Sequence, residues 1–132
     1  MAYDGTDFNG FQIQSARQSQ PATAGRPVRG GRARTIQGVL EKALTQITQE
    51  DIRLVGAGRT DSGVHALGQV VAFTTNWRHS LSDLHRAWNA VLPDDVAILA
   101  LSEAQPGFHP RFGAISRAYR YTIWNNTIRN PL

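Results

Sequence analysis

The stretch "DIRLVGAGRTDSGVHALGQVVAFTT", residues 51–75, joins two short apolar segments through a glycine-rich loop. Its first part, "DIRLVGAG", and its last part, "QVVAFTT", contain the branched apolar residues that are typical of strands. Between them, residues 56–69 include four glycines, which tolerate positive φ and let other groups approach the backbone closely. We therefore expect a strand, a loop that holds a group in a fixed place, and a returning strand.

Two helices are predicted on either side of this pair of strands. "TIQGVLEKALTQIT", residues 35–48, has apolar residues at helical spacing behind Thr35, the expected N-cap. Ser80 and Asp83 predict the start of a second helix, which Pro93 ends. One face of this second helix is apolar, with Leu81, Leu84, Trp88, Val91 and Leu92.

Further strands are expected at residues 1–5, at "VAILALSEA" (residues 96–104) and at "AISRAYRYTIWN" (residues 114–125). The predicted order is β-α-β-β-α-β-β. Strand pairs that alternate with helices predict an α+β fold, with both helices on one face of a mainly antiparallel sheet. The other face of the sheet is then free to bind a partner.

Length and composition exclude several classes of protein. The 132 residues fit one domain, and the lack of cysteine excludes disulfides, zinc ribbons and thiol catalysis. No apolar run approaches the ~20 residues that span a bilayer, and the first residues do not form a signal peptide. We expect a cytoplasmic protein with no membrane partner.

The distribution of charge indicates a nucleic-acid partner. The net charge is +4, and two stretches contain arginine without any acidic residue. These arginines are Arg17, Arg26, Arg29, Arg32 and Arg34 in the first stretch, and Arg111, Arg117, Arg120 and Arg129 in the second. Clustered arginine binds phosphate well, although a solvated basic surface is the alternative. Residues 12–34 are almost free of apolar side chains, which predicts an Arg-rich flexible loop.

The glycine-rich loop does not match known phosphate or metal motifs. A Rossmann fingerprint requires glycine where Asp61 stands, and a P-loop requires Lys and Ser or Thr where Val64 and His65 stand. The histidines form no pair with the spacing of metal ligands, so no metal site is expected. A triad of Asp61, Ser62 and His65 is disfavoured because triads combine residues that are distant in sequence.

Asp61 therefore remains as a lone carboxylate two residues after Arg59. A neighbouring guanidinium favours the ionised form of a carboxyl group, and an ionised carboxylate can act as a nucleophile. In the alternative interpretation, Asp61 caps a turn by binding backbone amides. The spacing of the residues leaves both interpretations open.

At "GRTDSGVHALGQV", residues 58–70, the sequence resembles the tRNA pseudouridine synthases of the A class. The resemblance continues through "AYDGTDFNGFQ" (residues 2–12), "TIQGVLEKAL" (residues 35–44), "LHRAWNAVLPDDVAI" (residues 84–98) and "FHPRFGAISRAYRYTIWN" (residues 108–125). These motifs follow in order over nearly the whole chain. They imply a pseudouridine-synthase-like half domain that isomerises uridine in the anticodon stem-loop of tRNA, at positions 38 to 40, without a cofactor.

The resemblance also implies roles for individual residues. It makes Asp61 the catalytic aspartate, Tyr119 the tyrosine that contacts the target base, and Arg59 the arginine that holds the flipped nucleotide. It implies that Phe108, His109, Arg111 and Phe112 belong to an RNA-contacting segment.

The same resemblance implies that residues 1–132 form the N-terminal, catalytic-Asp domain of a two-domain protein. Family members are about twice as long, and their second domain supplies further residues of the active site. The full-length protein is expected to be a homodimer that binds tRNA, and the isolated chain is expected to be inactive. Two alternatives stay open, namely a non-catalytic RNA-binding module of the RRM-like α+β type and a small-molecule α+β enzyme.

Overall fold

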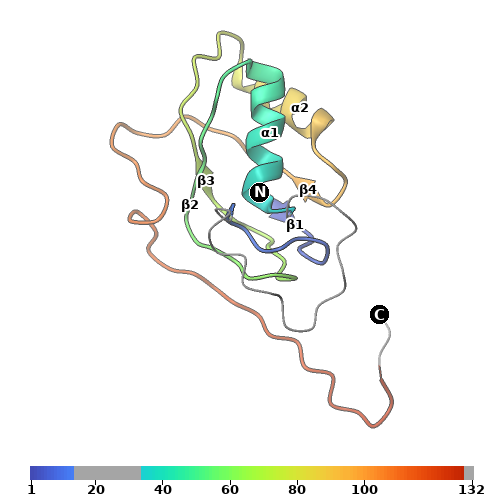
Figure 1. Ribbon diagram of the computed structural model, residues 1–132. Helices are drawn as coiled ribbons and strands as arrows, with labels where there is room; N and C mark the ends of the chain where they lie inside the picture. The colour runs from blue at the N-terminus through green and yellow to red at the C-terminus, as the bar shows by residue number, and fades with distance from the viewer. Residues whose placement is uncertain (14–33, 130–132) are drawn as a thin grey trace.

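The computed structural model describes residues 1–13 and 34–129 of the chain. The elements follow in the order β1 (Ala2–Tyr3), α1 (Ile36–Thr48), β2 (Val55–Gly56), β3 (Val71–Ala72), α2 (Leu81–Val91) and β4 (Val96–Ala97) (Figure 1). The Arg-rich loop expected over residues 12–34 lies, apart from its ends, outside the described residues. None of the helices in the described part is long and apolar enough to cross a membrane.

Two small antiparallel sheets form the β part of the fold. β1 pairs with β4, with Tyr3 opposite Val96, and β2 pairs with β3, with Val55 opposite Ala72. A single bridge between Tyr3 and Ala66 joins β1 to the segment that leads into β3. The α+β class and the antiparallel pairing are therefore confirmed, with strands shorter than the sequence predicts.

Helix α1 forms as its apolar spacing predicts. The Thr35 hydroxyl caps its start by accepting the Gly38 N–H at 3.2 Å. One buried acid interrupts its apolar face, because the Glu41 carboxylate accepts the Leu54 N–H at 3.0 Å and the Gln37 side-chain amide at 2.8 Å. Glu41 thus fixes α1 to the chain that enters β2.

Helix α2 begins at the predicted cap. The Ser80 hydroxyl accepts the Asp83 N–H at 3.0 Å and donates to the Asp83 carboxylate at 2.7 Å. Leu84 and Trp88 are buried, whereas Leu81 in the first turn is exposed. α1 and α2 lie side by side (Figure 1). The core gathers between them and the strands, and consists of Tyr3, Phe8, Phe11, Ile36, Leu40, Ala43, Leu44, Ile52, Leu54, Leu84, Trp88, Val96 and Ile98.

The long final strand predicted over residues 114–125 is wrong. This segment contains no strand and runs away from the helices as extended chain (Figure 1). Its alternating apolar side chains are exposed, and Ile115, Tyr121 and Ile123 are each more than four-fifths exposed. A strand needs a neighbouring backbone to accept its hydrogen bonds, and no described segment pairs with residues 114–125. The order of elements is thus β-α-β-β-α-β.

Candidate active site

The loop that carries Asp61 is fastened to the N-terminal segment at Thr60, one residue before the aspartate, and at Ala66, five residues after it. Tyr3 exchanges two backbone hydrogen bonds with Ala66, at 2.9 and 3.1 Å, and the Phe11 N–H donates to the Thr60 carbonyl at 2.9 Å. The Tyr3 and Thr60 hydroxyls are also hydrogen-bonded, at 2.9 Å. Burial raises the pKa of Tyr3, so its hydroxyl stays neutral and available for this bond.

A second set of bonds fastens the loop just after Asp61. The Ser62 hydroxyl and the Gly63 N–H both donate to the Phe8 carbonyl, at 3.0 and 3.2 Å. Since Phe8 is buried, this carbonyl is a fixed acceptor. The backbone around Asp61 is therefore held from both directions.

Two glycines of the N-terminal segment permit this close approach. A Cβ at Gly5 would lie 2.0 Å from the Val64 carbonyl oxygen, and one at Gly10 would lie 2.8 Å from the Thr60 carbonyl oxygen. Gly10 also has φ +85, which side chains rarely adopt. The glycines of residues 2–12 thus allow the aspartate loop to pack closely against the N-terminal segment.

The Asp61 carboxylate does not hold the loop to any of the described residues. Asp61 is exposed, and within residues 1–13 and 34–129 its side chain makes no hydrogen bond or ion pair. Only its backbone carbonyl is used, accepting the Val64 N–H at 3.2 Å. The interpretation of the carboxylate as a cap for backbone amides is thus not supported by the described part of the chain.

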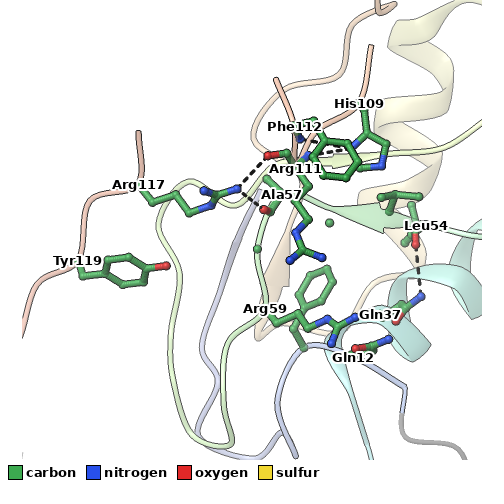
Figure 2. Close-up of a pocket in the computed structure, with 14 residues that line it drawn as sticks. Gln12, Gln37, Leu54, Ala57, Arg59, His109, Arg111, Phe112, Arg117 and Tyr119 are labelled. Carbon is green, nitrogen blue, oxygen red and sulfur yellow. Dashed lines mark hydrogen bonds between the residues drawn. The ribbon is translucent and has the colours of Figure 1, made fainter. Parts of the chain in front are cut away.

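Arg59 and Asp61, which are two residues apart, form no ion pair among the described side chains. Arg59 instead extends into a cleft of about 520 Å³ (Figure 2). The cleft lies between the β2 region and the segment after β4. It is lined by Phe11, Gln12, Gln37, Leu54, Val55, Gly56, Ala57, Gly58, Arg59, His109, Arg111, Phe112, Arg117 and Tyr119. Three of these residues are arginines and none is acidic, so the cleft favours an anionic ligand.

Arg117, which the sequence indicates only as one of the clustered arginines, is a residue of the cleft. Its guanidinium donates to the Ala57 carbonyl at 2.7 Å and to the Arg111 carbonyl at 3.1 Å (Figure 2). The Arg117 side chain packs over Gly58, where a Cβ would make an ordinary contact 3.6 Å from the Arg117 Nε. Arg117 therefore fixes one wall of the cleft to the other. Its position two residues before Tyr119 was the available signal.

The predicted RNA-contacting segment folds into a compact turn. The His109 and Phe112 rings are stacked with centroids 4.4 Å apart, and the His109 Nδ1 accepts the N–H groups of Arg111 and Phe112 at 3.2 and 3.3 Å. These bonds require Nδ1 to be unprotonated. Phe112 is 80% exposed and Phe108 47%, so both present aromatic surface to solvent.

The structure brings most of the predicted site residues to this one cleft. Arg59, His109, Arg111, Phe112 and Tyr119 line it, and Tyr119 is 68% exposed at its open side (Figure 2). Phe108 and Asp61 lie outside the lining, Asp61 two residues along the loop from Arg59. Within the described ranges, no three His, Asp or Glu side chains gather in a group that could hold a metal ion.

The α+β domain carries an exposed carboxylate two residues along the loop from Arg59, in a chain whose cleft is lined by arginines and aromatic rings. This arrangement fits the class of proteins that act on nucleic acid. Comparison with known families makes the assignment specific. The family profile described as tRNA pseudouridine synthase matches residues 1–113, and the chain belongs to this family.

Curated relatives agree with the family. The chain is 45% identical over 130 residues to tRNA pseudouridine synthase A of Roseiflexus castenholzii, which covers 98% of the chain and 42% of the relative. It is 49% identical over 123 residues to the protein of the same name from Chloroflexus aurantiacus, covering 93% of the chain and 38% of the relative. For the Geobacter sulfurreducens protein the identity is 41% over 132 residues, with 100% and 48% covered. The chain thus spans less than half the length of these relatives.

Proposed function

We propose that this chain provides the catalytic-aspartate domain of an enzyme that isomerises uridine to pseudouridine in tRNA. Asp61 is the catalytic carboxylate of this proposal, Arg59 and Tyr119 hold the target nucleotide, and the segment from Phe108 to Phe112 contacts the surrounding RNA. The target uridines are those of the anticodon stem-loop, at positions 38 to 40.

The observation that carries the proposal is the free carboxylate on a fixed loop. The residues on both sides of Asp61 bind to the N-terminal segment, and the Asp61 side chain binds no other described group. Among the described residues this carboxylate stabilises nothing, yet its neighbours in the loop are held in place, as expected of a group arranged to act on a ligand.

The reaction needs one such carboxylate. The N1–C1′ bond of uridine breaks, the uracil turns, and a C5–C1′ bond forms. The C5 hydrogen leaves as a proton, and N1 takes up a proton. Asp61 would attack C1′ as a nucleophile or remove a proton from C2′ as a base. In both cases the atoms balance without an oxidant or a metal, because substrate and product are isomers.

The cleft supplies what an RNA substrate requires. A uridine in a stem must leave the base stack before a carboxylate can reach its sugar, at a cost of a few kcal/mol. Phosphate contacts from Arg59 and Arg111, and stacking on exposed rings such as Phe112, can offset this cost.

The proposal extends to the assembled enzyme. The chain corresponds to 42% of the Roseiflexus relative, and we propose that a second domain completes the active site. The whole enzyme would be a homodimer that acts on cytoplasmic tRNA. The exposed apolar side chains of residues 115–128 support an association with further protein.

The test measures tritium release from tRNA that carries C5-labelled uridine, since forming the new bond expels that hydrogen. Two proteins are compared, this chain alone and a chimera that continues it with the C-terminal part of the Roseiflexus castenholzii relative. The chimera should release tritium and the chain alone should not. A chimera that binds tRNA without release would make the domain a non-catalytic RNA-binding module.

A further inference from the structure

A half-buried ion pair between Arg34 and Asp95 is connected to the aspartate loop through the N-terminal segment. The Arg34 guanidinium donates to both oxygens of the Asp95 carboxylate, from Nη1 at 2.6 Å and from Nη2 at 2.9 Å. The two side chains are only 35% and 29% exposed. Such a two-pronged contact fixes the plane of the guanidinium more firmly than a single bond does.

The same guanidinium rests on Phe8. The Arg34 Cζ lies 4.0 Å above the centroid of the Phe8 ring, and this ring is 1% exposed. The Arg34 carbonyl also accepts the Asn9 N–H at 2.8 Å. The side chain and the backbone of Arg34 therefore both hold the Phe8–Asn9 corner.

That corner is the anchor of the aspartate loop. The Phe8 carbonyl accepts both the Ser62 hydroxyl and the Gly63 N–H, the two groups that follow Asp61. One continuous path of contacts thus runs from Asp95 through Arg34 and Phe8 to the residues beside Asp61.

We propose that Arg34 and Asp95 are positioning residues for the Asp61 carboxylate. The proposal rests on the function proposed above. It also separates Arg34 from the other arginines of its basic stretch, because a guanidinium occupied by Asp95 and Phe8 holds protein rather than phosphate. Losing the pair lets the Phe8 corner shift, and Asp61 moves with it.

Two measurements test the proposal, and the first needs no activity. Amide exchange of Gly63 and Val64 is followed in this chain as it stands, with the amides of α1 as the reference for overall folding. Arg34→Gln and Asp95→Asn should speed exchange of Gly63 by about tenfold relative to the α1 amides. Arg34→Lys keeps the charge over Phe8 and should show a smaller increase. The control is Arg53→Gln, which breaks another arginine–carboxylate pair, with Glu41 at 3.2 Å, and should leave Gly63 unchanged.

The second measurement uses the chimera described above under saturating tRNA. Arg34→Gln and Asp95→Asn should lower the single-turnover rate by about tenfold or more, because a displacement of about 1 Å can cost about 10²-fold. The tRNA dissociation constant should stay within about twofold, and Arg34→Lys should restore part of the rate.

Several results would overturn the assignment. Unchanged Gly63 exchange in both variants would show that the pair does not hold the loop. A weaker tRNA affinity with an unchanged single-turnover rate would make Arg34 a phosphate contact. If Arg34→Gln exposes the α1 amides as well, Asp95→Asn and Arg34→Lys decide the question. A chimera without any activity would contradict the proposed function. The amide exchange of Gly63 would still test whether Arg34 and Asp95 hold the aspartate loop.

Discussion

Asp61 and its neighbour Ser62 have different roles in the loop. The Ser62 hydroxyl donates to the Phe8 carbonyl at 3.0 Å, whereas the Asp61 carboxylate binds nothing in the described part of the chain. Asp61→Asn should therefore change the free energy of unfolding by less than about 0.5 kcal/mol. Ser62→Ala should lower it by about 0.5–1.5 kcal/mol, the net worth of one hydrogen bond. Urea unfolding of the chain measures both values. These roles would be wrong if Asp61→Asn destabilised the chain more than Ser62→Ala does.

The two neighbouring tyrosines can be separated in the same way. Tyr119 lines the cleft, whereas Tyr121 does not, and both are exposed. Tyr119→Phe should slow pseudouridine formation in the chimera by about tenfold, the equivalent of one lost hydrogen bond in the transition state. Tyr121→Phe is the matched control, and neither change should alter the melting temperature. A larger loss of rate from Tyr121→Phe would require the two roles to be exchanged.

At the scale of elements, the close contact between the N-terminal segment and the aspartate loop depends on Gly10. Alanine there would adopt φ +85 and place its Cβ 2.8 Å from the Thr60 carbonyl oxygen. Gly10→Ala should therefore destabilise the fold by about 1–3 kcal/mol. Gly68 is the control in the aspartate loop, because a Cβ there meets no atom within 4 Å. Gly68→Ala should change the stability by less than about 0.5 kcal/mol, and equal losses at both glycines would refute the argument.

The elements that the sequence predicts well are those whose signals are local. Thr35 and Ser80 cap the two helices as expected, since a cap needs only the amide of a residue three positions later. The glycine-rich loop and its two flanking strands were also predictable from residues 51–75. The buried position of Glu41 was not, because its partner is the Leu54 N–H, which only the fold brings to it.

The predictions that failed concern contacts that the local sequence does not determine. Residues 114–125 carry a strong strand pattern, but a strand forms only against a partner, and none is present in the described part of the chain. Proximity in sequence suggested that the Arg59 guanidinium is a neighbour of the Asp61 carboxylate, yet Arg59 reaches into the cleft. Arg117 was missed as a cleft residue because its acceptors, the Ala57 and Arg111 carbonyls, come from two other segments.

For the whole molecule, the arginines of the cleft should dominate binding to tRNA. Each phosphate that is neutralised contributes roughly −0.7 to −0.9 to the slope of log affinity against log salt concentration. Arg59→Gln and Arg111→Gln should each reduce the steepness of this slope by about that amount. Arg53→Gln should not, because Arg53 pairs with Glu41 outside the cleft. Filter binding of tRNA to this chain at several salt concentrations makes the comparison. An affinity for tRNA that does not vary with salt would contradict the prediction that the cleft arginines bind phosphates.

We propose that the fold of the whole domain positions one catalytic carboxylate, that of Asp61. The most direct measurement is the rate of tritium release from C5-labelled tRNA by the chimera with Asp61 and with Asp61→Asn, at matched tRNA occupancy. Asparagine keeps the shape of the side chain but can be neither a nucleophile nor a base. We expect Asp61→Asn to abolish release while the tRNA dissociation constant stays within a few-fold of that of the unsubstituted protein. Release by Asp61→Asn within about tenfold of the unsubstituted rate would contradict this expectation, and would make Asp61 an ordinary surface residue of the loop.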